Sequence, residues 1–317
     1  MTRLTRAQAA TLLGALALAR PATAARAQGN APIRIATNPI EMGMPPVYAQ
    51  NLGYLAKARL NVNIEVVPSG AAVVAAILGN SVDIGLAAVN ALVSAHSRNL
   101  PLVAIAPGIE YLSATMEHSA ALMLGPNSSV RRADELNGKA ISVNSLRNVG
   151  ETAVRSWLDK HGGDSTTTRF LEMPYPAMAE ALTSGRVDAA FVAEPFITAA
   201  TGRGCRVLAY GFDSIAPEFL ISVWLCTTQW AKEHPDVISR FAAVMRDTAI
   251  WANKTPPEST EMLAAFTKMT PAAIASITRS HFAEALTPGL LQPVIDATAR
   301  YNGFAAFPAA ELIFRAN

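Results

Sequence analysis

The chain has 317 residues, of which 51% are hydrophobic and 16% are charged, and it contains two cysteines. This composition excludes a disordered chain, a collagen-like chain and a small disulfide-stapled domain, and the length suits one large or two medium domains. Of the 26 basic residues, four arginines lie in the first 27 positions, a segment without Asp or Glu. The rest of the chain holds 22 basic and 24 acidic residues, so it lacks the basic excess of a nucleic-acid-binding protein.

The first 27 residues have the pattern of an export signal. Arg3 and Arg6 precede an apolar run at 9–19, and Ala25-Arg26-Ala27 offers an A-x-A cleavage site. The run has eleven residues, too few to cross a bilayer, which takes roughly 20. The segment contains no Arg-Arg pair and no cysteine, which favours the general secretory route without a lipid anchor. We expect a signal peptide at 1–27 and a mature protein that is soluble and outside the cytoplasm; the alternative is a buried N-terminal helix.

Strands and helices alternate from residue 33 onward. Short apolar segments between turn residues predict strands at 33–36, 62–67, 82–88 and 102–106. Helical patterns lie between them at 47–56, 71–78 and 89–97. Because each strand is almost entirely apolar, the pattern predicts a parallel sheet with helices on both faces.

The same order of elements then occurs a second time. Strands are predicted at 139–143, 169–173 and 187–193, with helices at 151–161 and 177–183. Asn38 matches Asn144 at an offset of 106 residues, and Val82-Asp83 matches Val187-Asp188 at an offset of 105. The ordered series of strand, turn and helix around these matches predicts two similar α/β lobes.

The rest of the chain is predicted to be helical and to pack around the first lobe. His234-Pro235-Asp236 begins a helix in which six apolar or small residues from Val237 to Trp251 fall on one face. Two apolar extended stretches, 119–124 and 220–227, lie between the lobes in sequence. We expect them to be the strands of a two-strand hinge.

Ligands of open parallel sheets bind beyond the carboxyl ends of the strands, where loops lead into helices. Six such loops are predicted here, and facing lobes would bring them to one cleft. Their polar and aromatic residues each have a structural alternative: Ser69 can cap a helix, the asparagines can shape turns, and Glu194 can cap the next helix. Tyr175, between two prolines, is expected to form an aromatic wall. Asp83 and Asp188 start strands, away from the cleft, and are expected to be structural.

Motifs of known catalytic sites are missing from the sequence. It contains no G-x-S-x-G, no H-E-x-x-H and no P-loop, and its five histidines lack metal-ligand spacing. We therefore expect no catalytic residues, no metal and no cofactor. Cys205 and Cys226 fall on different predicted strands, and the sequence leaves open whether they form a disulfide.

Three segments carry a resemblance to a known family. They are SGAAVVAAILGNSVDIGLAA at 69–88, LNGKAISV at 136–143 and MAEALTSGRVDAAFVAEPF at 178–196. The sequence resembles the periplasmic substrate-binding proteins of ABC importers, in the nitrate/sulfonate/taurine group, which also includes pyrimidine-precursor binders related to thiamine biosynthesis. The resemblance covers nearly all of the chain after residue 27.

The resemblance implies a type II periplasmic binding protein fold, with two Rossmann-like lobes, a two-strand hinge and extra C-terminal helices on the first lobe. The lobes would comprise 31–118 with 225–317, and 119–224. Residues that follow the strands bind ligand in this family, and the corresponding positions here are Asn38, Ser69, Gly70, Asn90, Ser145, Asn148, Tyr175 and Glu194.

The implied function is a monomeric receptor that captures a small organic solute and delivers it to an ABC permease in the inner membrane. The loop at 38–44 lacks the aromatic residues of sulfonate binders, and Arg147 is the one basic residue in the six loops, against Glu41 and Glu194. A neutral or singly charged solute therefore fits better than a dianion. The alternatives are an enzyme of the same fold acting on a pyrimidine or pyridoxal-type molecule, and a regulator's effector domain, which would need a DNA-binding helix-turn-helix.

Overall fold

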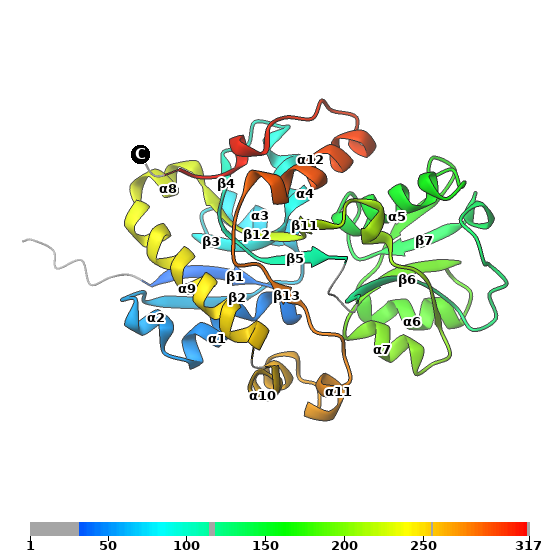
Figure 1. The fold of residues 1–317 in the computed structure, drawn as a ribbon, viewed down its shortest axis with the longest axis horizontal. Helices are drawn as coiled ribbons and strands as arrows, with labels where there is room; N and C mark the ends of the chain where they lie inside the picture. The colour runs from blue at the N-terminus through cyan, green and yellow to red at the C-terminus, as the bar shows by residue number, and fades with distance from the viewer. Residues whose placement is uncertain (1–31, 114–117, 255, 316–317) are drawn as a thin grey trace, which may run out of the picture. The chain divides into compact units, whose positions relative to one another are not determined.

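The computed structural model describes residues 32–113, 118–254 and 256–315. The predicted signal peptide at 1–27 lies outside the described residues. Residues from Pro32 onward form one compact unit that contains two five-stranded sheets, a three-stranded sheet and the helices around them (Figure 1).

The first sheet has the strand order β2-β1-β3-β12-β4. Its strands are β1 (Ile33–Thr37), β2 (Val62–Val66), β3 (Ile84–Ala88), β4 (Leu102–Pro107) and β12 (Ser222–Thr227). β1 pairs in parallel with β2 and β3, whereas β12 runs antiparallel between β3 and β4.

Side chains of the first sheet point alternately to its two faces, so both faces are apolar and both are covered by helices. On one face, Trp224 meets Phe241 edge to face with ring centroids 5.6 Å apart; the opposite face holds Val223 and Leu225, packed in a different cluster. The helices of this lobe are α1 (Pro45–Asn51), α2 (Tyr54–Lys57), α3 (Gly70–Leu78), α4 (Val89–His96), α8 (Thr228–Glu233) and α9 (Pro235–Lys254).

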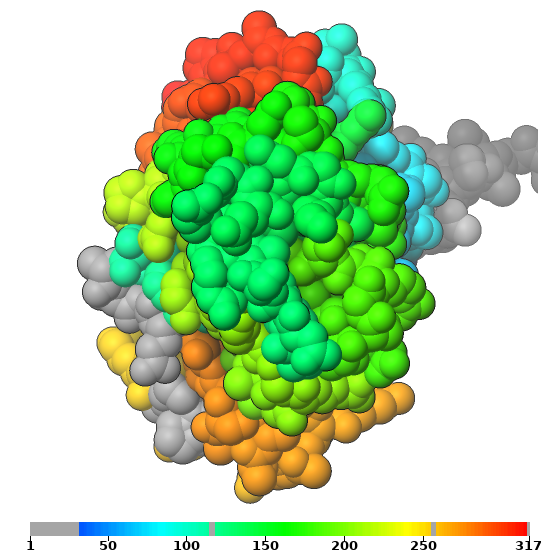
Figure 2. Space-filling model, turned by 90° about the vertical axis from the view of Figure 1, so that its right-hand side faces the viewer, coloured from blue at the N-terminus to red at the C-terminus, as the bar shows by residue number. Residues whose placement is uncertain are grey.

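The second sheet repeats this arrangement, with the order β8-β7-β9-β6-β10. Its strands are β6 (Ala120–Leu124), β7 (Ala140–Val143), β8 (Arg169–Glu172), β9 (Ala189–Ala193) and β10 (Arg206–Ala209), and its helices are α5 (Val149–Lys160), α6 (Tyr175–Thr183) and α7 (Phe196–Thr201). β7 pairs in parallel with β8 and β9, and β6 is antiparallel to β9 and β10. We call each sheet with its helices the first and the second lobe; Figure 2 views the second lobe, in green.

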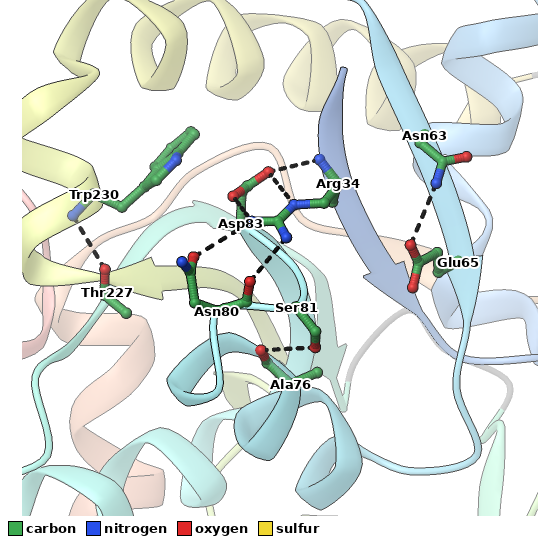
Figure 3. A network of polar contacts seen from close by, with 9 residues as sticks. All are labelled: Arg34, Asn63, Glu65, Ala76, Asn80, Ser81, Asp83, Thr227 and Trp230. Carbon is green, nitrogen blue, oxygen red and sulfur yellow. Dashed lines mark hydrogen bonds and ion pairs between the residues drawn. The ribbon is translucent and has the colours of Figure 1, made fainter. Parts of the chain in front are cut away.

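Equivalent hydrogen bonds confirm the internal repeat. Asp83 Oδ2 accepts from the backbone N–H of Arg34 at 2.8 Å, and Asp188 Oδ2 accepts from that of Ala140 at 2.9 Å. The Arg34 guanidinium also binds Asp83, with Nη2–Oδ1 at 2.6 Å, and donates to the carbonyl of Asn80 (Figure 3). Both aspartates therefore tie neighbouring strands together at their amino ends, as expected for structural residues.

The expectation for the hinge strands is wrong in its location. The stretches 119–124 and 220–227 mostly form β6 and β12, which are the antiparallel strands inside the two sheets. The chain passes between the sheets through β5 (Ile109–Leu112) and β11 (Glu218–Leu220), which pair antiparallel with each other. An apolar extended run suits both a strand inside a sheet and a strand that joins the two sheets. Only the pairing of the strands distinguishes these two positions. The parallel sheet expected from the apolar strands is likewise a mixed one.

The C-terminal segment is helical, as predicted, apart from the short strand β13 (His281–Phe282), which pairs with β5. Its helices are α10 (Pro256–Thr267), α11 (Pro271–Ala275) and α12 (Pro288–Asn302). α12 reaches the second lobe, where Tyr301 donates a hydrogen bond to Asp159 Oδ2 at 2.9 Å. One predicted helix, at 47–56, is divided into α1 and α2 because Gly53 adopts a left-handed conformation with φ +72°.

Short 3-10 helices complete the fold, at η1 (Glu41–Gly43), η2 (Asp134–Leu136), η3 (Gly211–Ser214) and η4 (Ala309–Leu312). None of the helices in the part of the chain that the structure describes combines the length and apolar character needed to span a bilayer.

Candidate functional site

One pocket collects residues from both lobes and from the segments that join them. Three of its sides come from loops that follow strands β1, β8 and β9, so it lies beyond the carboxyl ends of the strands. Its cavity volume is about 70 Å³, within about 500 Å³ of empty space that includes open solvent. The lining residues are Ile40, Glu41, Met42, Ile109, Ser119, Ala120, Tyr175, Phe191, Ala193, Glu194, Phe212, Ile221 and Ser280.

Apolar and aromatic side chains form most of the pocket wall. Phe191 and Phe212 pack edge to face with their ring centroids 5.2 Å apart. Tyr175 stacks on Phe196 with centroids 5.7 Å apart and planes inclined by 17°. Rings fixed in this way offer flat apolar surfaces to a bound molecule.

Two of the eight predicted ligand-binding residues, Tyr175 and Glu194, line this pocket. Tyr175 begins α6, and its hydroxyl makes no hydrogen bond with the described residues. The Glu194 carboxylate accepts from the N–H of Thr198 at 3.1 Å and from its hydroxyl at 2.9 Å. Glu194 therefore both faces the pocket and braces the first turn of α7.

Two of the remaining six are helix caps. Ser69 accepts from the N–H of Ala72 at 3.2 Å at the start of α3, and Asn148 accepts from the N–H of Glu151 at 2.9 Å at the start of α5. Both contacts satisfy N–H groups that have no partner within the helix. The structural alternative considered for Ser69 is confirmed, and neither residue lines the pocket.

Asn38, Gly70, Ser145 and Asn90 also lie outside the pocket lining. Asn38 is buried and donates to the carbonyl of Val67 at 3.2 Å. Gly70 is the first residue of α3, and the Ser145 side chain is half-buried in the loop before α5. Asn90 is fully buried and contacts the second lobe.

Sequence reasoning missed the partner of Glu41. This carboxylate faces the pocket in η1, and the Arg279 guanidinium pairs with it from the other end of the chain, 238 residues away. The backbone N–H of Ser280 donates to the second carboxylate oxygen at 2.8 Å. The count of charges in the six predicted loops did not include this partner, because Arg279 lies outside them. No local pattern in the sequence connects these two segments. They meet because the segment before β13 packs against η1.

The Glu41 side chain is 5% exposed and that of Arg279 is 20% exposed. Burial raises the pKa of Glu41 above its ordinary value, against the opposing effects of Arg279 and of the Ser280 hydrogen bond. Arg279 also donates to the hydroxyl of Ser259 at 2.7 Å and to that of Tyr48 at 3.3 Å. The acid is thus held in place by a network rather than by one contact.

Neither cysteine lines the pocket. Cys205 and Cys226 are both buried free thiols, and burial raises the pKa of Cys226 to about 12. Within residues 32–113, 118–254 and 256–315, no group of three or more His, Cys, Asp and Glu side chains could hold a metal ion.

Solved structures with this fold include solute-binding proteins and an enzyme. The periplasmic aliphatic sulphonate binding protein SsuA of Escherichia coli is 18% identical, with 90% of this chain and 92% of that chain covered and a TM-score of 0.72. The alkanesulfonate-binding protein SsuA of Xanthomonas axonopodis pv. citri, bound to MOPS, is 19% identical, with 90% and 99% covered and a TM-score of 0.73. The desulfurization enzyme DSZB is 14% identical, with 89% and 95% covered and a TM-score of 0.64.

These structures confirm the expected fold, with two lobes of the periplasmic binding protein type. No curated protein has a sequence that matches this chain significantly. The model of the family described as NMT1/THI5 like matches residues 43–259, which include the whole second sheet, the first sheet apart from β1, and most of the pocket. On this match, the chain belongs to the NMT1/THI5-like family.

Proposed function

We propose that this protein is a receptor that binds a small organic solute in the pocket between its lobes and delivers it to an ABC permease. The observation that supports this most is the composition of the pocket, because the first lobe, the second lobe and the joining strand β5 all contribute to its wall. A solute in this position contacts both lobes at once, and it therefore stabilises the closed arrangement relative to an open one. The binding proteins that share the fold support the same function.

The solute that suits the pocket is uncharged and has a flat apolar part. Among the described residues, no Lys, Arg or His side chain lines the pocket, and its two carboxylates are already engaged by Arg279 and Thr198. A sulfonate or carboxylate would leave water for a site without a matching cation, which is unfavourable. The hydroxyls of Tyr175, Ser119 and Ser280 can bind the polar groups of a neutral molecule.

The same proposal includes the cellular setting. The export pattern of the first 27 residues supports secretion into the periplasm by the general secretory route. We propose that the mature protein acts there as a monomer, with the inner-membrane permease as its partner.

An enzyme of this fold is the second candidate, because the desulfurization enzyme DSZB has the same fold. Among the described residues, the pocket wall lacks a cysteine, a histidine and a lysine, and it holds acids that are engaged by their neighbours. The receptor is therefore the function that these side chains support better. Turnover of a bound pyrimidine or pyridoxal-type compound would reverse this preference.

A thermal-shift panel tests the receptor function. The purified protein without residues 1–27 is heated with matched pairs of solutes: benzamide and benzoate, a neutral pyrimidine and a pyrimidine carboxylate, and an alkyl amide and an alkanesulfonate. A neutral member at 100 times its Kd should raise Tm by about 4–5 °C. If none of the panel shifts Tm while the protein unfolds cooperatively, the proposed receptor function fails for these classes.

The variant Tyr175→Ala tests the site itself. Loss of an aromatic wall should weaken binding of the best solute about tenfold, which corresponds to about 1.4 kcal/mol. Tyr54→Ala, a half-buried tyrosine in α2 outside the pocket, is the matched control and should leave affinity unchanged. Equal affinities of the two variants, measured by calorimetry, would remove Tyr175 from the site.

A further inference from the structure

A hydrogen bond joins the two lobes outside the pocket. Asn90, in the first turn of α4, is fully buried, and its Nδ2 donates to the backbone carbonyl of Arg147 at 2.7 Å. α4 packs on the first sheet, whereas Arg147 lies in the loop between β7 and α5 of the second lobe. This contact can exist only when the lobes are together.

The second lobe holds the Arg147 carbonyl in place. The N–H of Arg147 donates to Glu151 Oε2 at 2.7 Å, and Glu151 in turn pairs with Arg155 at 2.8 Å. The N–H of the preceding residue, Leu146, donates to Glu172 Oε2 at 3.0 Å. These contacts keep Arg147 at φ +59°, a left-handed conformation that is unfavourable for a residue with a side chain. The acceptor is therefore positioned before the lobes meet.

The oxygen of the Asn90 amide lacks a hydrogen bond in the closed arrangement. Its Oδ1 is buried and has no hydrogen-bond partner among the described residues. An unpaired buried acceptor opposes closure, because separation of the lobes would return it to water. The hydrogen bond of Nδ2 thus stabilises the closed arrangement, and the unpaired Oδ1 makes that stabilisation smaller.

We propose that Asn90 is a closure latch, a positioning residue that sets the balance between separated and closed lobes through the Arg147 carbonyl. The proposal rests on the proposed receptor function for its biological meaning, since closure is what a solute would stabilise. A single neutral hydrogen bond changes an equilibrium about two- to tenfold. A hydrogen bond of this strength leaves closure reversible, so a bound solute can still shift the ratio of closed to separated protein.

The test measures the distance between the lobes without any solute. Spin labels are attached at Gln50→Cys in α1 and Glu180→Cys in α6, two exposed positions on different lobes. The native cysteines are buried and should not react with the label. Pulsed electron resonance then gives the ratio of short to long distances for Asn90→Ala, with Asn63→Ala, an exposed asparagine in β2, as the matched control.

Asn90→Ala should lower the ratio of closed to separated protein about two- to tenfold, and Asn63→Ala should not change it. Arg147→Gly keeps the carbonyl and accommodates the positive φ, so it should retain the wild-type ratio. If Asn90→Ala does not fold, Asn90→Leu serves, because an apolar side chain of similar size fills the same space and has no group that can donate to the carbonyl.

An unchanged ratio in a folded Asn90 variant would overturn the latch, and so would a wild-type protein that shows only the long distance. Neither result depends on solute binding. Failure of the solute panel with an intact latch would instead count against the receptor function alone.

Discussion

The buried pair of Glu41 and Arg279 provides the sharpest test of how the pocket is held together. In the variant Arg279→Met, the apolar stem stays but the guanidinium is lost. Glu41, 5% exposed, would then keep one N–H donor, from Ser280. Removing one partner of a buried ion pair costs about 3–5 kcal/mol, because the remaining charge is left without compensation. The hydroxyls of Ser259 and Tyr48 also lose their hydrogen bonds to the guanidinium.

The expected loss in the free energy of unfolding at pH 7 is therefore about 3–5 kcal/mol, measured by urea titration with tryptophan fluorescence. Glu41→Gln should cost less, because Arg279 is 20% exposed and keeps its two hydroxyl acceptors. The double variant should be more stable than Arg279→Met, since it removes the uncompensated charge. The reasoning is refuted if Arg279→Met costs less than about 1 kcal/mol, or if the double variant is no more stable than the single one.

The same pair predicts a pH dependence with a definite sign. Because burial raises the pKa of Glu41 in the folded state above its unfolded value, the folded protein binds more protons than the unfolded chain in the window between the two values. The contribution of Glu41 to stability is therefore fully present below the unfolded pKa and is lost as pH rises through the folded pKa. Glu41→Gln should remove this decline, and parallel stability curves for wild type and variant above pH 4 would contradict it.

Two further predictions concern the repeat and the thiols. Asp83→Ala should cost about 2 kcal/mol in urea unfolding, and at least about 1 kcal/mol more than Asp188→Ala. The reason is that Asp83 is 14% exposed and binds Arg34 at 2.6 Å, whereas Asp188 is 39% exposed and lies 3.6 Å from Lys139; equal losses would contradict this ranking. Cys226, whose pKa is raised to about 12 by burial, should not react with a thiol reagent at pH 8 until the protein unfolds, and rapid labelling of the native protein would contradict its burial.

Local sequence patterns were sufficient for the elements and for the repeat. Apolar runs between turn residues predicted most strands, and the offset between Asp83 and Asp188 predicted two lobes, which their equivalent hydrogen bonds confirm. Helix caps such as Ser69 were also recognisable, because a cap depends on residues three positions away. Two pocket residues, Tyr175 and Glu194, were found because they follow strands.

The tertiary structure alone decided which apolar runs became the antiparallel strands β6 and β12 and which strands join the lobes. It also decided that Arg279 neutralises Glu41 across 238 residues and that Asn90 meets the Arg147 carbonyl across 57. The physical reason is range: periodicity and capping depend on neighbours within a few residues, whereas strand pairing and buried charge pairs depend on where the whole chain brings distant segments together. The sequence alone therefore determined the elements of this protein and their duplication, and the packing of distant segments determined which side chain neutralises Glu41 and which residues meet between the lobes.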